Sequence, residues 1–160
     1  MNIAIIDDRK EDREKLGGIL LKYAADSGEK LNIEHFDSAE ALLDNYQPFL
    51  YAILFLDIYM DGMTGMQAAK IIRETDRDVI LVFLTTSEEH HVEALHNHAF
   101  DYIEKPADPA QVCRIMDDIF ERKTQLGQSL SFSVNRTKYH LALNDIVAIS
   151  ASSHNVEIYD

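Results

Sequence analysis

The sequence predicts a doubly wound α/β fold with a parallel sheet, followed by a short β-rich C-terminal segment. Apolar runs of strand length alternate with segments of helical period through most of the chain. Several runs are almost continuously apolar, which is typical of a parallel sheet covered by helices on both faces. Five strand-helix units in a row favour a doubly wound sheet. We expect the strands at residues 3–6, 31–36, 52–56, 79–84 and 100–103.

Capping residues place the helix starts between these strands. The first helix is expected at residues 9–25, although the pair Gly17-Gly18 weakens it. Asp37 or Ser38 precedes a helix at residues 39–46, and Glu40 stands three residues after Asp37, as in a capping box. Two further caps complete the pattern: Thr64 before residues 65–74, and Asp108 before Pro109.

The pattern changes after residue 123. Short β segments are expected at residues 130–134, 139–141, 145–149 and 156–159, and no helix follows them. About thirty residues of strand are too few to bury a core of their own. This segment is therefore expected to pack on the first domain, to pair with another chain or to open a larger domain.

Composition narrows the classes of partner. The net charge of −13 argues against binding nucleic acid through the overall field, because phosphate backbones are neutralised by clustered Lys and Arg. The longest apolar run, residues 50–56, is too short to cross a bilayer, and no signal-peptide pattern precedes the first strand. We expect a cytoplasmic protein with no membrane partner. The single cysteine, Cys113, falls at an apolar helix position and is given no functional role.

Polar side chains follow four of the predicted strands where each strand stops. Asp7 and Asp8 follow the first strand, Asp57 the third, Thr85 the fourth and Lys105 the fifth. Because the carboxyl ends of such strands meet at one edge of the sheet, these groups are expected to face a common crevice. Carboxylates at close quarters repel one another, so the site is expected to need a divalent cation with oxygen ligands. Mg²⁺ fits, since it needs few carboxylates and keeps several waters.

This set of groups suits phosphoryl transfer. One carboxylate can act as the nucleophile toward a phosphoryl donor, Lys105 can stabilise the transferred charge, and the Thr85 hydroxyl can hydrogen-bond to the group. Spacing alone does not decide which carboxylate is the nucleophile. Asp57 follows the most apolar strand, which favours a central position, whereas the adjacent pair Asp7-Asp8 suits metal binding.

Separate motifs together resemble the receiver domain of bacterial response regulators over residues 1–123. They are Asp7-Asp8, the stretch FLDIYMDGMTG at residues 55–65, Thr85, and DYIEKP at residues 101–106. The resemblance implies a flavodoxin-like sheet with strand order 2-1-3-4-5. It also implies a sensor histidine kinase as partner, a homodimer formed on phosphorylation, and no enzyme activity beyond self-phosphorylation and slow autodephosphorylation.

The resemblance assigns roles by position. It implies that Asp57 is the phosphoacceptor and that Mg²⁺ is held by Asp7, Asp8, Asp57 and the backbone carbonyl of Tyr59. It implies that Thr85 and Tyr102 form the switch. Lys105 would pair with the phosphate, and its bond to Pro106 would be cis. Many receivers have proline where this chain has Asp61, so the resemblance leaves the shape of the loop after Asp57 open.

The tail has a resemblance of its own. FSVN at residues 132–135, NDIVAIS at 144–150 and SHNVEI at 153–158 are similar to the first quarter to third of a LytTR-type DNA-binding domain. This implies transcription regulation as the output, with DNA bound only through the complete C-terminal domain and His154 as a DNA-binding residue. We expect residues 124–129 as a linker and 130–160 as the partial LytTR-like segment.

Other interpretations stand beside these. The pair Asp7-Asp8, or Thr85 with its neighbour, could serve only as helix caps, and Tyr102 could be an ordinary half-buried strand residue. The histidines of residues 90–98 lack a regular i, i+4 pair, so a solvated helix face is favoured over a metal site; they are His90, His91, His96 and His98.

Two other functions are alternatives. One is a receiver without output that acts by dimerisation or as a phosphate sink. The other is a magnesium-dependent phosphatase of the haloacid-dehalogenase kind, which has a second acid two residues after the nucleophile of the first strand. Here Asp7 is followed by Asp8 and Arg9, so that pattern fails.

Overall fold

The computed structural model describes the backbone of residues 1–86, 99–127, 129–134, 137–142, 148–152 and 155–159, and the side chains of residues 1–86 and 99–123. The chain divides into two compact units, Met1–Ile115 and Met116–Asp160. Among the described residues, no helix is both long enough and apolar enough to cross a bilayer.

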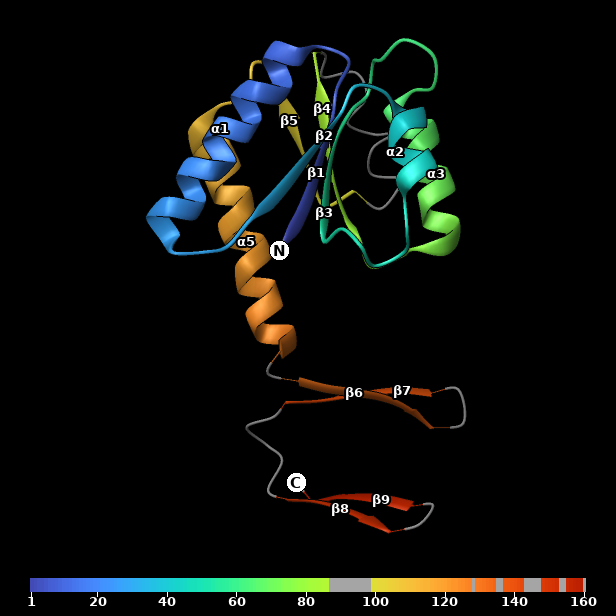
Figure 1. Ribbon diagram of the computed structural model, residues 1–160. Coiled ribbons are helices and arrows are strands. Elements are labelled where there is room, and N and C mark those ends of the chain that lie inside the picture. The colour runs from blue at the N-terminus through green and yellow to red at the C-terminus, as the bar shows by residue number, and fades with distance from the viewer. Residues whose placement is uncertain (87–98, 128, 135–136, 143–147, 153–154, 160) are drawn as a thin grey trace. The chain divides into compact units, whose positions relative to one another are not determined.

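The first unit is built on a five-stranded parallel sheet with the order β2-β1-β3-β4-β5. The strands are β1 (Asn2–Ile6), β2 (Asn32–Phe36), β3 (Ile53–Asp57), β4 (Ile80–Thr85) and β5 (Asp101–Glu104). One face is covered by α1 (Lys10–Ser27) and the first turns of α5 (Pro109–Gly127), and the other by α2 (Ala39–Asn45) and α3 (Gly65–Thr75) (Figure 1). The doubly wound fold and its strand order are therefore confirmed.

The central strands end on polar residues rather than on apolar ones. Asp57 is the last residue of β3 and pairs with Leu84, and Thr85 is the last residue of β4 and pairs with Glu104. The apolar pattern placed both strand ends one residue too early, because the backbone ladder continues after the hydrophobic run stops. Asp57 and Thr85 are consequently held within the sheet itself.

The core between the sheet and α2 and α3 is apolar and closely packed. Its buried members include Leu54 and Leu56 of β3, Leu42 of α2, Ile72 of α3 and Phe83 of β4. Burying side chains of this size contributes about 2 kcal/mol each. This packing makes the sheet a rigid support for the residues at its carboxyl edge.

Helix capping agrees with the sequence at three starts, including Ser38 as one of the two caps expected for α2, and differs only in the capping box expected there. The Thr64-Gln67 capping box of α3 forms, and the Asp108 carboxylate accepts a hydrogen bond from the Gln111 backbone at 3.1 Å. At α2 the cap is Ser38, whose hydroxyl accepts from the Ala41 backbone at 3.2 Å. The expected capping box between Asp37 and Glu40 is wrong, since Ser38 already occupies the cap position.

The paired glycines of α1 do not interrupt the helix, which runs from Lys10 to Ser27. Gly28, with a φ of 75°, is its C-terminal cap. A Cβ at Gly17 would lie only 3.0 Å from the imidazole of His35 on β2. The absence of a side chain at Gly17 therefore lets α1 approach the edge of the sheet. This close approach offsets the low helix propensity of glycine.

The second unit contains the end of α5 and two antiparallel strand pairs. β6 (Ser129–Val134) pairs with β7 (Thr137–Ala142), and β8 (Ala148–Ser152) pairs with β9 (Asn155–Tyr159). The β-rich character of the tail is confirmed. The linker expected at residues 124–129 is corrected in part, because α5 continues to Gly127. Three predictions fall partly or wholly outside the described residues: residues 145–147 of the expected third segment, His154, and the histidines of residues 90–98.

Candidate functional site

The parallel register brings the polar strand ends to one edge of the sheet. Ile6 of β1 pairs with Leu56 of β3, so Asp7 and Asp57 occupy neighbouring strand ends. The Lys105 backbone N–H donates to the Thr85 carbonyl at 2.7 Å, which places Lys105 directly after the end of β5 and beside β4. The crevice predicted from the strand ends is therefore built by the sheet hydrogen bonds.

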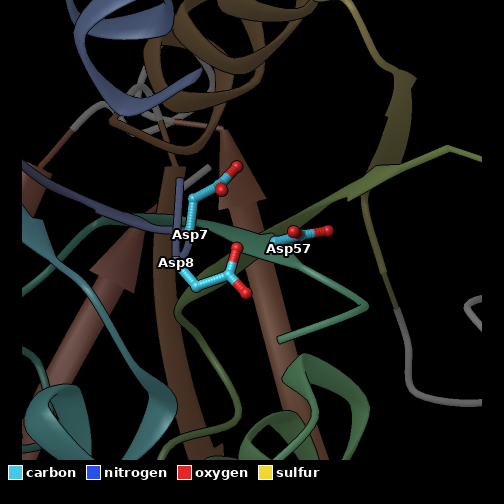
Figure 2. A group of neighbouring side chains, drawn as sticks. All are labelled: Asp7, Asp8 and Asp57. Carbon is cyan, nitrogen blue, oxygen red and sulfur yellow. The ribbon is translucent and has the colours of Figure 1, made fainter. Parts of the chain in front are cut away.

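Three carboxylates gather at this edge. Asp7, Asp8 and Asp57 each present an oxygen, and these oxygens lie within 4.8 Å of one another (Figure 2). Asp7 and Asp57 are buried, whereas Asp8 is exposed. The cluster is thus anchored in the sheet and reachable from solvent on the side of Asp8.

Lys105 is a cation that contacts two members of this cluster, Asp7 and Asp57. Its ammonium lies 2.6 Å from one carboxylate oxygen of Asp7 and 2.6 Å from one of Asp57. Burial by itself lowers the pKa of Lys105, but the hydrogen bonds and negative charges of Asp57 and Asp7 raise it above the ordinary value. Lys105 is therefore charged at neutral pH and shared by two acids.

The Asp57 carboxylate is held by hydrogen bonds, but its negative charge is not fully compensated by them. Burial raises its pKa, Lys105 and the Tyr59 backbone N–H lower it, and the charge of Asp7 raises it further; the net shift is upward. The Tyr59 N–H donates to Asp57 at 3.2 Å, and the Arg9 N–H donates to Asp7 at 2.9 Å. One ammonium among several carboxylates leaves an excess of negative charge, and an oxygen donor set of this kind suits a hard divalent cation.

Gly65 allows the next helix to begin directly against the end of β3. A Cβ at Gly65 would lie 2.1 Å from the Asp57 main-chain oxygen, so no other residue fits without a shift of the backbone. The Gly65 N–H donates to the Ile58 carbonyl at 3.3 Å. This hydrogen bond joins the two ends of the loop after Asp57. The loop carries the Tyr59 carbonyl that the resemblance assigns to the metal.

Thr85 and Tyr102 differ in exposure. Thr85 is buried at the end of β4, whereas Tyr102 is 36% exposed on β5, where its carbonyl accepts from the Gln111 side chain at 3.0 Å. Their roles in switching stay predictions. The bond between Lys105 and Pro106 is cis, as the resemblance implied.

Two residues of the site were missed from the sequence. An oxygen of Asp12 lies 3.5 Å from the Lys105 ammonium, and the guanidinium of Arg13 donates to the Asp7 main-chain carbonyl. Both belong to the first turns of α1. A usable signal existed, because residues four positions after Asp8 and Arg9 return to the same side of a helix that starts here.

Comparison with known proteins agrees with this geometry. Residues 3–117 match the response regulator receiver domain family. The sensory transduction protein LytT of Bacillus subtilis is 26% identical over 168 residues, which cover 99% of this chain and 68% of that protein. The transcriptional regulatory protein BtsR of Shigella flexneri is 30% identical over 134 residues, covering 81% of this chain and 52% of that protein.

A solved structure is similar as well. The response regulatory domain of protein mrkE from Klebsiella pneumoniae superposes with a TM-score of 0.69 and 25% identity, over 78% of this chain and 99% of that one. The chain spans about half to two thirds of the length of the curated relatives named above. The matched segment contains the acidic cluster and Lys105, and the chain belongs to the response regulator receiver domain family.

Proposed function

We propose that this chain is the signal-receiving part of a two-component response regulator and that Asp57 accepts a phosphoryl group from a sensor histidine kinase. The observation that supports this most directly is the position of Asp57. Its carboxylate is buried at the end of a central strand, lies within 4.8 Å of Asp7 and Asp8, and touches the ammonium of Lys105 at 2.6 Å.

The acidic cluster fits Mg²⁺ because it offers oxygen donors with an excess of negative charge. Asp7, Asp8, Asp57 and the Tyr59 carbonyl would hold the ion. When bound, Mg²⁺ would neutralise these carboxylates and the oxygens of the incoming phosphoryl group. The chain supplies the rest of the site from a rigid sheet edge, which holds the nucleophile in place before the donor arrives.

The residues act in a simple order. A carboxylate oxygen of Asp57 forms a bond to phosphorus as the bond between phosphorus and the donor, an imidazole nitrogen of the kinase, breaks. Lys105 then pairs with an oxygen of the transferred group, and the Thr85 hydroxyl donates a hydrogen bond to it. Thr85 and Tyr102 would couple this event to the surface of the domain, including a homodimer surface.

The output proposed for the intact protein is transcription regulation. Residues 1–123 would form the receiver and residues 130–160 the first part of a LytTR-like domain, a view that the names of the relatives LytT and BtsR support. DNA would be bound only through the complete C-terminal domain, with His154 among the contacts. The place of action would be the cytoplasm, where the kinase presents its phosphohistidine.

The test uses a small phosphodonor in place of the kinase. Incubation with acetyl phosphate and Mg²⁺ should add one phosphoryl group to the wild type, detected by intact mass spectrometry, and Asp57→Asn should gain none. Asp61→Asn removes an exposed carboxylate of the same loop and should be modified like the wild type. An unmodified wild type, or equal modification of Asp57→Asn, would remove the proposal.

A further inference from the structure

Glu40 contacts a loop that belongs to the phosphorylation site rather than to its own helix. Its carboxylate accepts a hydrogen bond from the Met63 backbone N–H at 2.9 Å, although the two residues are 23 positions apart. Ser38 caps α2, so the Glu40 carboxylate is not engaged as a cap of that helix. The side chain instead joins α2 to the loop between β3 and α3, residues 58–64.

The loop backbone is shaped around this carboxylate. Gly62 has a φ of 83°, and a Cβ at this position would lie 2.8 Å from the same Glu40 oxygen that Met63 binds. Any side chain at Gly62 would therefore be strained in its backbone and would also displace Glu40. Two consecutive loop residues thus depend on the place of one side chain from α2.

The other described restraints on the loop lie near its two ends, and the half-buried Met63 side chain also packs against the core. At the start, the Tyr59 N–H binds Asp57 and the Met60 side chain is buried in the core. At the end, Thr64 and Gln67 form the capping box of α3. Between these ends, Asp61 and Gly62 are exposed, and Asp61 carries no ring that would restrict its φ. Glu40 supplies a restraint on this middle part from a separate helix.

We infer that Glu40 is a positioning residue for the cation site: by accepting the hydrogen bond from the Met63 N–H next to Gly62, its carboxylate keeps the loop in the conformation that presents the Tyr59 carbonyl beside Asp57. The inference rests on the proposed function, in that the Tyr59 carbonyl is taken as a metal ligand. Glu40 is not one of the residues proposed to hold the ion or the phosphoryl group. It acts through the main chain of the loop.

The test separates the hydrogen bond from the charge. Glu40→Ala removes both, whereas Glu40→Gln keeps an acceptor oxygen and removes only the charge. Asp44→Ala removes an exposed acid one turn later on α2 and serves as the matched control. The measurements are the Mg²⁺ dissociation constant from backbone-amide NMR titration, the hydrogen-exchange rate of the Met63 amide in Mg²⁺-free buffer, and the thermal unfolding midpoint.

For Glu40→Ala we expect Mg²⁺ binding about fivefold weaker than in the wild type, the size expected when one ordinary hydrogen bond is lost. Exchange of the Met63 amide should be faster, with little change in the unfolding midpoint. Glu40→Gln and Asp44→Ala should bind Mg²⁺ within about twofold of the wild type, because distant exposed charges contribute little.

Two results would overturn the inference: Glu40→Ala that binds Mg²⁺ as the wild type does, or Glu40→Gln that binds as weakly as Glu40→Ala, which would leave only a charge effect. Unchanged exchange of the Met63 amide in Glu40→Ala would remove the restraint itself. A wild type that binds no Mg²⁺ would instead count against the proposed function, while the exchange measurement would still decide the role of Glu40 in the loop.

Discussion

Asp57 and Asp76 are both almost completely buried in the first unit, with 3% and 1% of their surface exposed, yet their pKa values move in opposite directions. Asp57 ends β3 at the carboxyl edge of the sheet. Asp76 directly follows α3 and precedes β4, so it lies near the amino end of β4 rather than at the carboxyl edge of the sheet. The same side chain in two equally buried places therefore has two different environments.

Asp76 is surrounded by donors. Its carboxylate accepts from the Tyr46 hydroxyl and the Phe49 N–H at 2.8 Å each, and from the Asp78 and Val79 N–H groups at 3.0 Å each. Burial alone would raise the pKa of Asp76, but these hydrogen bonds together lower it below the ordinary value. All of these donors come from the fold, and the carboxylate ties residues 46–49 to residues 76–79.

Asp57 has fewer partners and more negative neighbours. It shares Lys105 with Asp7, and burial together with the Asp7 charge leaves its pKa above the ordinary value. A structural carboxylate is thus one whose charge the protein already compensates. A carboxylate at a functional site keeps an uncompensated charge that a cation or a phosphoryl group can use.

The largest effect on stability is expected at the satisfied carboxylate. Asp76→Asn should lower the free energy of unfolding by about 3 kcal/mol, because several buried donors lose an ionised acceptor. Asp57→Asn should change it by less than about 1 kcal/mol, since it removes an uncompensated buried charge. Urea denaturation measures both values, with the exposed Asp78→Asn as control. Equal losses for the two variants would break the comparison.

A smaller loss is expected when the cation of the functional cluster is removed. Lys105→Met should cost about 2 kcal/mol in Mg²⁺-free buffer, less than the usual penalty for breaking a buried pair, because Asp57 can take up a proton. Adding Mg²⁺ should restore part of this stability, as read from the unfolding midpoint. Lys10→Met, which breaks an exposed pair with Glu14, should have almost no effect. No recovery with Mg²⁺ would show that Lys105 serves packing alone.

The smallest effect is a difference in pH dependence. The folded pKa of Asp76 is lowered, so its contribution is complete above the unfolded value of about 3.9 and is lost as pH falls through the folded pKa. The folded pKa of Asp57 is raised, so its carboxyl favours folding at low pH and loses that advantage as pH rises through the folded pKa.

The contributions of the two carboxyls to stability therefore change in opposite directions with pH. The check is the free energy of unfolding of wild type, Asp57→Asn and Asp76→Asn between acidic and neutral pH without Mg²⁺. The wild type should lose its advantage over Asp76→Asn toward acid pH and should lose stability relative to Asp57→Asn toward neutral pH. Parallel curves for the two variants would contradict the assigned shifts.

The fold was predictable because its signals are local and periodic. Continuous apolar runs mark the buried strands, and caps such as Thr64 and Asp108 mark helix starts within a few residues of themselves. Asp7, Asp57 and Lys105 could be predicted as neighbours because the rule that parallel strands end together needs no knowledge of packing. The predicted strand ends were one residue too early at Asp57 and Thr85, because the hydrogen-bonded strand pairing continues one residue beyond the apolar run.

The residues that were misassigned or missed are those whose partners lie far along the chain. Glu40 was assigned to a helix cap but binds Met63, and Asp12 was not singled out although it reaches Lys105. Asp76 attracted no notice, although it is bound by Tyr46 and Phe49. In each case a flexible polar side chain has several local options of similar energy.

The sequence by itself determined the doubly wound sheet and the acidic edge that carries Asp57, since hydrophobic period and strand ends are written in consecutive residues. Only the tertiary structure decided which carboxylates are compensated and which are not. The physical reason is that the pKa and the role of a buried acid depend on the donors and charges within a few ångströms of it, and those come from segments that only folding brings together.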